Sequence, residues 1–170
     1  MQPWGYRKVP LILKLRQITK MQLLLFEIAN GRYALDVRQI IEIVPLVELK
    51  KNPASPDYVA GLMNYRGEGT PVIDLNQLVD SVPYEDSLST RIIIIKYPVT
   101  DKGDMALALI ANNVTEIVRS NLTSPPPAGV LMNSSICDRE TVPETNEIIQ
   151  WFVIKKILPE KEITLLFEEN

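Results

Sequence analysis

The sequence of 170 residues contains no histidine and only one cysteine, Cys137. Histidine is the commonest general base near neutral pH and the commonest metal ligand, so its absence removes the usual basis for acid–base catalysis and for a metal centre. A single cysteine cannot form an internal disulfide, and Cys137 lies in a predicted polar loop without a base to activate its thiol. We therefore expect neither an enzyme nor a bound cofactor or metal.

The sequence also lacks a long apolar run and a secretory leader. No apolar stretch approaches the roughly 20 residues that a helix needs to cross a bilayer. The apolar stretch of residues 9–13 is too short for a signal peptide and is followed by further charges. The glycines of residues 66–69 lack the spacing of a phosphate-binding loop. These features predict a cytoplasmic protein without stable membrane insertion.

The charges are unevenly distributed. Residues 1–20 hold five of the 18 basic residues and none of the 21 acidic ones, so residues 21–170 carry an acidic excess. A folded nucleic-acid reader normally shows a basic face, and we therefore expect no nucleic-acid partner. The basic N-terminal extension is either mobile, or translated ahead of a native start at Met21, or a segment that lies on an anionic membrane.

Apolar runs and turn signals predict a mainly β fold. The dipeptide Asn30-Gly31 predicts a hairpin, and four consecutive isoleucines within residues 91–97 predict a strand buried on both faces. A short helical turn is expected over residues 76–81. The predicted strands cover residues 23–29, 33–37, 40–44, 59–65, 71–75, 91–97, 105–111, 114–118, 151–154 and 163–167.

The chain is organised around the predicted hairpin of residues 56–75. Gly67 and Gly69 separate its two apolar strands and allow the backbone angles of a tight turn. Arg66 lies at this turn. It is either a solvated turn charge or a residue that contacts a partner.

A weak internal repeat aligns residues 33–44 with residues 107–118, with five identities in twelve positions. Chance agreement between two apolar-rich stretches is one interpretation. The other is a pair of similar β lobes, each a small barrel, packed on one another. Small barrels also avoid exposed sheet edges.

Taken together, these residues resemble the CheW-like adaptors of bacterial chemosensory systems. The resemblance runs from about residue 23 to residue 118, and its motifs are residues 33–37 with 40–43, 56–61, and 64–67 with 71–75. It implies a mainly all-β fold of two SH3-like five-stranded barrel lobes with short helical turns. Residues 21–170 would form one domain with two lobes, at approximately residues 21–88 and 89–170. Whether the lobes exchange strands is left open.

The resemblance also implies a non-catalytic function. Such proteins bridge the regulatory domain of the histidine kinase CheA to the cytoplasmic tips of chemoreceptors, which would recruit this chain to membrane-bound receptor arrays. The pathway is left open between swimming, pilus motility and phototaxis. The family commonly ends in a helix across the barrels, whereas residues 163–167 are predicted to form a last strand shortly before the sequence stops at Asn170. Either the sequence is truncated or the second lobe closes differently.

Six positions match the partner-binding motifs of the family. The Asn-x-Arg-Gly motif and the Val/Ile-x-Glu strand supply most of them, and the full set is Ile40, Glu42, Gly61, Asn64, Arg66 and Gly67. Structural roles compete with partner binding at several of these positions. Ile40 suits the core, Gly61 suits close strand packing, and Asn64 suits a bond to its own turn. Glu42 is either solvent-facing or placed for a partner.

A second hypothesis is an acidic β-barrel enzyme or a small-ligand sensor that uses the cleft between the lobes. It requires a deep pocket with clustered carboxylates, for which Asp36 and Asp74 are the candidates. Both residues follow predicted strands, where turn capping is the competing role.

Overall fold

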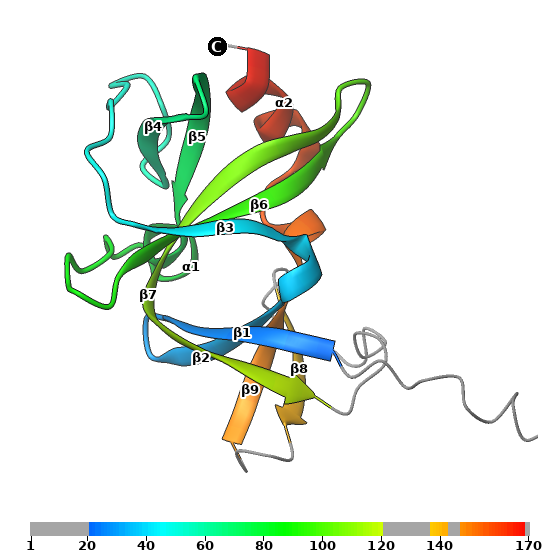
Figure 1. Cartoon of the computed structure of the whole chain (residues 1–170). Coiled ribbons are helices and arrows are strands. Elements are labelled where there is room, and N and C mark those ends of the chain that lie inside the picture. The colour runs from blue at the N-terminus through cyan, green and yellow to red at the C-terminus, as the bar shows by residue number, and fades with distance from the viewer. Residues whose placement is uncertain (1–20, 121–136, 143–146, 169–170) are drawn as a thin grey trace, which may run out of the picture.

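The computed structural model describes residues 21–120, 137–142 and 147–168, and the basic extension of residues 1–20 lies outside them. The described part of the chain is mainly β (Figure 1). Its strands are β1 (Met21–Ile28), β2 (Gly31–Asp36), β3 (Ile40–Pro45), β4 (Val59–Tyr65), β5 (Glu68–Asp74), β6 (Arg91–Val99), β7 (Gly103–Ser120), β8 (Cys137–Val142) and β9 (Glu147–Phe152). The helical elements are η2 (Val37–Gln39), α1 (Leu75–Asp80), η3 (Ile154–Lys156) and α2 (Glu160–Glu168).

The strands form two five-stranded lobes that share β7. The first lobe has the order β8-β9-β2-β1-β7, and the second has the order β3-β6-β7-β5-β4. The predicted fold class is confirmed, although the backbone ladder of neither lobe closes into a full barrel within the described residues. In the second lobe the two edge strands approach each other, because Lys50 beyond β3 forms an isolated bridge with Leu62 of β4.

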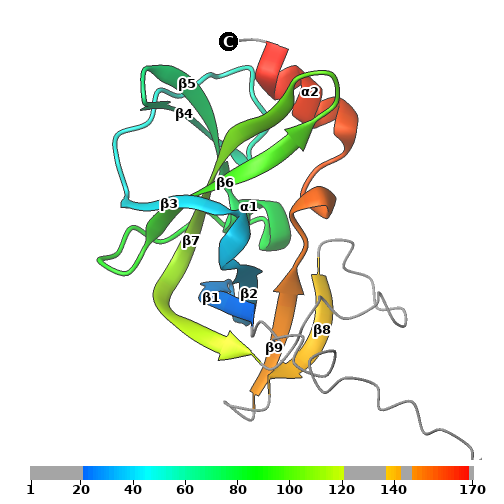
Figure 2. The ribbon, with the colours of Figure 1, turned by 45° about the vertical axis from the view of Figure 1, so that its right-hand side comes forward.

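Strand β7 crosses from the second lobe to the first as one element of 18 residues (Figure 2). The two separate strands predicted for residues 105–111 and 114–118 are therefore wrong. Asn113 has a φ of 44°, and the pairing of β7 with β1 shifts register at this point. Asparagine tolerates the left-handed region, so the chain bends here while the strand continues.

Each lobe combines strands that precede residue 88 with strands that follow it. Strands β1 and β2 join β7–β9 in the first lobe, while β3–β5 join β6 and β7 in the second. The chain crosses from the first lobe to the second at η2 and returns within β7 around Asn113. Because η2 aligns with residues 111–113 in the internal repeat, the two copies of the repeat contain these two crossings.

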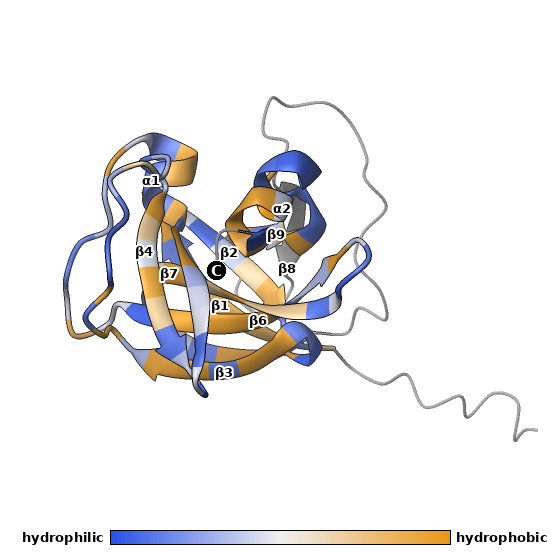
Figure 3. Ribbon diagram, turned by 90° about the horizontal axis from the view of Figure 1, so that it is seen from above, coloured by the Kyte–Doolittle hydropathy of each residue, from blue (hydrophilic) through white to orange (hydrophobic). Residues whose placement is uncertain are grey.

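The four isoleucines of β6 explain how the lobes pack. All four side chains are fully buried, as predicted. Ile92 and Ile94 contribute to a core inside the second lobe, whereas Ile93 and Ile95 contribute to a larger core that also contains residues of β1, β9 and α2. The hydrophobic colour in Figure 3 accordingly follows β6 and its neighbours rather than the turns. The region between the lobes is thus filled by shared core.

The C-terminal part departs from the prediction. Residues 163–167 form part of helix α2 rather than a strand, and only the first half of residues 151–154 is strand. Ile163 and Phe167 lie four residues apart on one helical face and are both buried. Figure 2 shows the chain leaving the first lobe through β9 and reaching α2 beside the second lobe. A final helix is therefore present, and Cys137 begins β8 instead of lying in a loop.

Candidate functional site

The turn between β4 and β5 holds Arg66 in a fixed, exposed position. Arg66 and Gly67 both have positive φ, 53° and 88°, as a two-residue hairpin of the favoured twist requires. The Asn64 side chain accepts a hydrogen bond of 2.9 Å from the Gly67 backbone N–H. The turn is therefore local and well determined, and β5 begins directly after it, so that Gly69 lies in the strand. The side chain of Arg66 is 71% exposed.

Gly61 has a structural role in the same hairpin. Its φ is +146°, and a Cβ at this position would lie 2.7 Å from the carbonyl oxygen of Lys50. That distance is far too short for a side chain, so only glycine lets the loop after β3 approach β4 this closely. Of the two interpretations of Gly61, close strand packing and partner binding, the structure thus supports close strand packing.

A β-bulge separates the roles of Ile40 and Glu42. The two residues would share one face of a regular strand, but the pairing of β3 with β6 shifts register between them. As a result Ile40 is half-buried and packs on the shared core, whereas Glu42 faces solvent. The bulge explains how an edge strand can both anchor itself in the core and expose a carboxylate.

Glu42 and Arg66 meet at the surface of the second lobe, together with Tyr65. The Arg66 Nη2 atom lies 3.5 Å from Glu42 Oε2, and the Tyr65 hydroxyl donates a 2.9 Å hydrogen bond to the same oxygen. The guanidinium carbon of Arg66 lies 5.0 Å from the centre of the Tyr65 ring. We call Glu42, Tyr65 and Arg66 the edge cluster, because they join the edge strand β3 to the hairpin of the other edge strand, β4.

The electrostatics of the edge cluster favour an interaction role over a stabilising one. Exposed ion pairs contribute only about 0–1 kcal/mol to folding, and the side chains of Glu42 and Arg66 are 45% and 71% exposed. Partial dehydration and then the bond to Glu42 raise the pKa of Tyr65, so its phenol stays neutral. The planar guanidinium keeps donors directed at solvent, which suits recognition of carboxylates or carbonyl oxygens.

The sequence interpretation missed Tyr65. Its ring packs on the core of the second lobe while its hydroxyl reaches Glu42. The alternation of side chains along the strand could have identified this residue, because Tyr65 follows the buried Met63 by two positions and therefore lies on the same face. Of the six predicted positions, the structure brings Glu42 and Arg66 together. Asn64 and Gly67 form the turn that holds Arg66, and Gly61 and Ile40 lie beneath.

Asp36 and Asp74 act as caps at two separate turns. Asp36 accepts bonds from the backbone and guanidinium of Arg38, and this pairing raises the pKa of Arg38. Asp74 caps α1, accepting from the backbone N–H groups of Asn76 at 3.0 Å and Tyr84 at 2.9 Å. A carboxylate engaged in capping is not poised for catalysis.

Two further observations concern other classes of site. Within residues 21–120, 137–142 and 147–168, no three His, Cys, Asp or Glu side chains are grouped to hold a metal ion. None of the helices in the same residues is both long and apolar enough to span a membrane.

Comparisons with known proteins agree with this architecture. A family model described as CheW-like domain matches residues 22–162. The chain is 30% identical over 128 residues to a chemotaxis protein CheW of Bacillus subtilis, covering 75% of this chain and 80% of that protein. It is 25% identical over 119 residues to the chemotaxis protein CheV3 of Helicobacter pylori, covering 70% of this chain but 37% of that protein.

A solved structure has the same fold. The crystal structure of the scaffolding protein TtCheW from Thermoanaerobacter tengcongensis matches with a TM-score of 0.68 at 24% identity, covering 82% of this chain and 88% of that one. The match extends beyond the region on which the sequence motifs fall. It therefore includes part of the C-terminal segment that the sequence alone left unassigned to the family.

Proposed function

The chain belongs to the CheW-like domain family of chemotaxis scaffolds, and on that premise we propose that it is a non-catalytic adaptor that couples a CheA-type histidine kinase to chemoreceptors. Its partners in this proposal are the regulatory domain of the kinase and the cytoplasmic tip of the receptor. The protein would act in the cytoplasm at membrane-bound receptor arrays.

The edge cluster is the observation that carries this proposal. An arginine held outward on a rigid turn loses little conformational freedom when a partner binds, which favours affinity. Its guanidinium offers a fork to carboxylates or backbone carbonyls, and Glu42 offers an acceptor to a partner's cation. Ile43, which follows Glu42 and is 37% exposed, adds apolar contact area on the same edge strand.

The six motif positions divide into two roles in this proposal. Glu42 and Arg66 would touch a partner. Asn64 and Gly67 would set the direction of Arg66 through the turn, while Gly61 and Ile40 would fix the hairpin and β3 on the body of the lobe. This division predicts that contact residues affect binding more than stability, and that supporting residues affect both.

A binding experiment with purified proteins tests the proposal. The full chain is titrated by calorimetry with the regulatory domain of the CheA-type kinase of its own organism, and separately with a soluble receptor tip fragment. We expect saturable binding to each partner and co-elution of all three on size-exclusion chromatography. Absence of binding to both partners, with the chain folded by circular dichroism, would overturn the proposal.

A further inference from the structure

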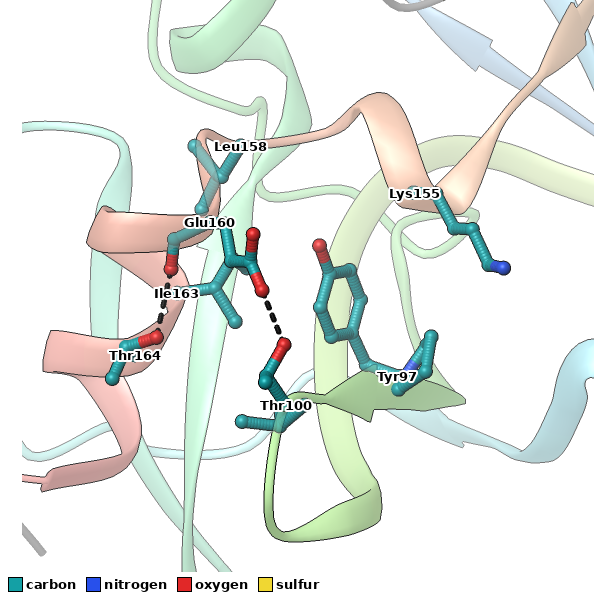
Figure 4. A pocket seen from close by; sticks show the side chains of 9 residues that line it. Tyr97, Thr100, Lys155, Leu158, Glu160, Ile163 and Thr164 are labelled. Carbon is teal, nitrogen blue, oxygen red and sulfur yellow. Dashed lines mark hydrogen bonds between the residues drawn. The ribbon is translucent and has the colours of Figure 1, made fainter.

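A second region of the molecule has the features of a small-ligand site. Helix α2, η3 and the end of β6 line an open hollow of 370 Å³ (Figure 4). This volume lies within the range of natural ligand pockets, which starts at about 300 Å³. The hollow shares no residue with the edge cluster. Its lining consists of Tyr97, Pro98, Val99, Thr100, Lys155, Leu158, Glu160, Ile163 and Thr164.

Tyr97 brings a buried hydroxyl without a partner into this hollow. The residue is only 5% exposed, yet its hydroxyl forms no hydrogen bond within the part of the chain that the structure describes. Buried polar groups are almost always paired, so an unpaired one calls for a partner that the protein itself does not supply. In Figure 4 the hydroxyl points into the hollow, beside the side chain of Glu160.

Glu160 is the only acidic side chain in the lining of the hollow. The hydroxyl of Thr100 donates to Glu160 Oε1, and no donor among the described residues reaches Oε2. The Thr164 hydroxyl bonds to the main-chain oxygen of Glu160 at 2.9 Å, which fixes this residue at the start of α2. The hollow thus contains a carboxylate oxygen and a hydroxyl close together, both able to accept a hydrogen bond.

The other charges around the hollow do not cancel the negative charge of this carboxylate. Lys155 lines the rim, but Figure 4 shows its amine directed away from Tyr97 and Glu160. The start of α2 carries about half a positive charge, which the full negative charge of Glu160 outweighs. Burial, and then the charge of Glu160, raise the pKa of Tyr97, so the phenol stays neutral near pH 7. A cationic hydrogen-bond donor therefore fits this position better than an anion.

We propose that this hollow binds a small primary alkylammonium ion. The ammonium would donate to the free oxygen of Glu160 and to the Tyr97 hydroxyl, while the short aliphatic chain contacts Val99, Leu158 and Ile163. An occupied site would hold α2 against the turn between β6 and β7, because the hollow is lined by both. The inference is independent of the proposed kinase and receptor contacts.

Nuclear magnetic resonance titration of the full chain with n-butylammonium chloride tests the proposal. We expect saturable amide shifts confined to α2, η3 and the turn after β6, together with a rise in melting temperature. Sodium butyrate, which has the same aliphatic chain and the opposite charge, should produce neither change. Equal shifts with butyrate, or no saturable shifts with butylammonium, would contradict the proposal.

Two variants identify the groups that bind. Tyr97→Phe keeps the ring and should weaken butylammonium binding by about threefold to tenfold, and Glu160→Gln should weaken it by about tenfold or more. Tyr58→Phe is the matched control. The Tyr58 hydroxyl also bonds to a glutamate of α2, Glu162, but neither residue lines the hollow.

The control separates direct binding from loosening of the helix. We expect unchanged butylammonium affinity in Tyr58→Phe. If Tyr58→Phe weakens binding as much as Tyr97→Phe, the effect comes from loss of helix docking and the assignment of the hollow is wrong. Because kinase binding is not part of this measurement, its result is distinguishable from failure of the adaptor function.

Discussion

The two lobes carry similar ion pairs at their edges, and the difference between these pairs is the basis for proposing that only one of them faces a partner protein. In the second lobe, Glu42 of the edge strand β3 pairs with Arg66 at 3.5 Å. In the first lobe, Glu116 of the edge strand β7 pairs with Arg32 at 3.3 Å. The internal repeat aligns Glu42 with Glu116, so the sequence alone treats the two glutamates alike.

The arginines differ in their setting. Arg32 lies within β2 and reaches across β1 to Glu116 on β7, and its side chain is 32% exposed. Arg66 lies on a turn with positive φ, and its side chain is 71% exposed. An arginine that spans three strands holds the sheet together, whereas one that projects from a turn is available to another protein. The two aligned glutamates thus pair with arginines in different backbone settings, and we propose that only Arg66 contacts a partner protein.

The largest expected effect on folding stability concerns the backbone beneath the Glu42–Arg66 pair. Gly61→Val should lower the free energy of unfolding by about 3 kcal/mol, because its side chain would clash with the Lys50 carbonyl at an unfavourable φ. Gly67→Ala is the matched control. Its φ is also positive, but an added Cβ would have no atom within 4 Å apart from its neighbours in the chain. We therefore expect the free energy of unfolding to fall by about 1 kcal/mol. Urea unfolding measures both, and equal losses would refute the close approach at Gly61.

A smaller effect on the free energy of unfolding should appear at alkaline pH. Tyr58, Tyr65, Tyr84 and Tyr97 have phenols with raised pKa and lie in or against the second lobe. For Tyr58 the causes are burial and then the bond to Glu162. A raised pKa means that the folded state retains protons that the unfolded state releases, so this stabilisation is complete below pH 10 and is lost above it.

Tyr58→Phe should therefore reduce the loss of stability above pH 10. Urea unfolding at pH 8 and pH 11 gives the slope for the variant and the unaltered chain. Hydrogen exchange at the same two pH values should show that α2 loses less protection in Tyr58→Phe than in the unaltered chain, because Tyr58 bonds to Glu162 of α2. An equal loss of stability from pH 8 to pH 11 in the variant and the unaltered chain would contradict this role of the Tyr58 hydroxyl.

The sequence predicted the features that neighbouring residues determine. Asn30-Gly31 sets a hairpin through its backbone preferences, and four adjacent isoleucines fit only a strand covered on both faces. Strand-end aspartates were also interpreted correctly as caps, since Asp36 and Asp74 each bond to backbone groups just after them. In these cases the responsible contacts are short in sequence.

The errors arose where tertiary contacts decide the outcome. Residues 163–167 are rich in β-branched and aromatic side chains, yet Pro159 and the acidic residues after it begin a helix whose buried face docks on the second lobe. Asn112 and Asn113 resemble a turn, but pairing with β1 on the far side carries the strand through. The contact between Glu42 and Arg66 depends on the curvature of the whole second-lobe sheet, which brings its two edge strands together. No local sequence pattern encodes this curvature.

The two arginines also give the smallest expected change in stability. Arg66→Ala should alter the free energy of unfolding by less than about 0.5 kcal/mol, and Arg32→Ala should lower it by up to about 1 kcal/mol, because the Arg32 side chain is less exposed and reaches across β1 to β7. Their effects on binding should run in the opposite order.

Calorimetric titration of Arg66→Ala and Arg32→Ala with the regulatory domain of the CheA-type kinase tests the central claim most directly. We expect Arg66→Ala to weaken binding by about tenfold or more, as for an interface hot spot, and Arg32→Ala to bind as the unaltered chain does. If Arg32→Ala weakens binding as much as Arg66→Ala, or if folded Arg66→Ala binds normally, the partner surface is not the edge cluster.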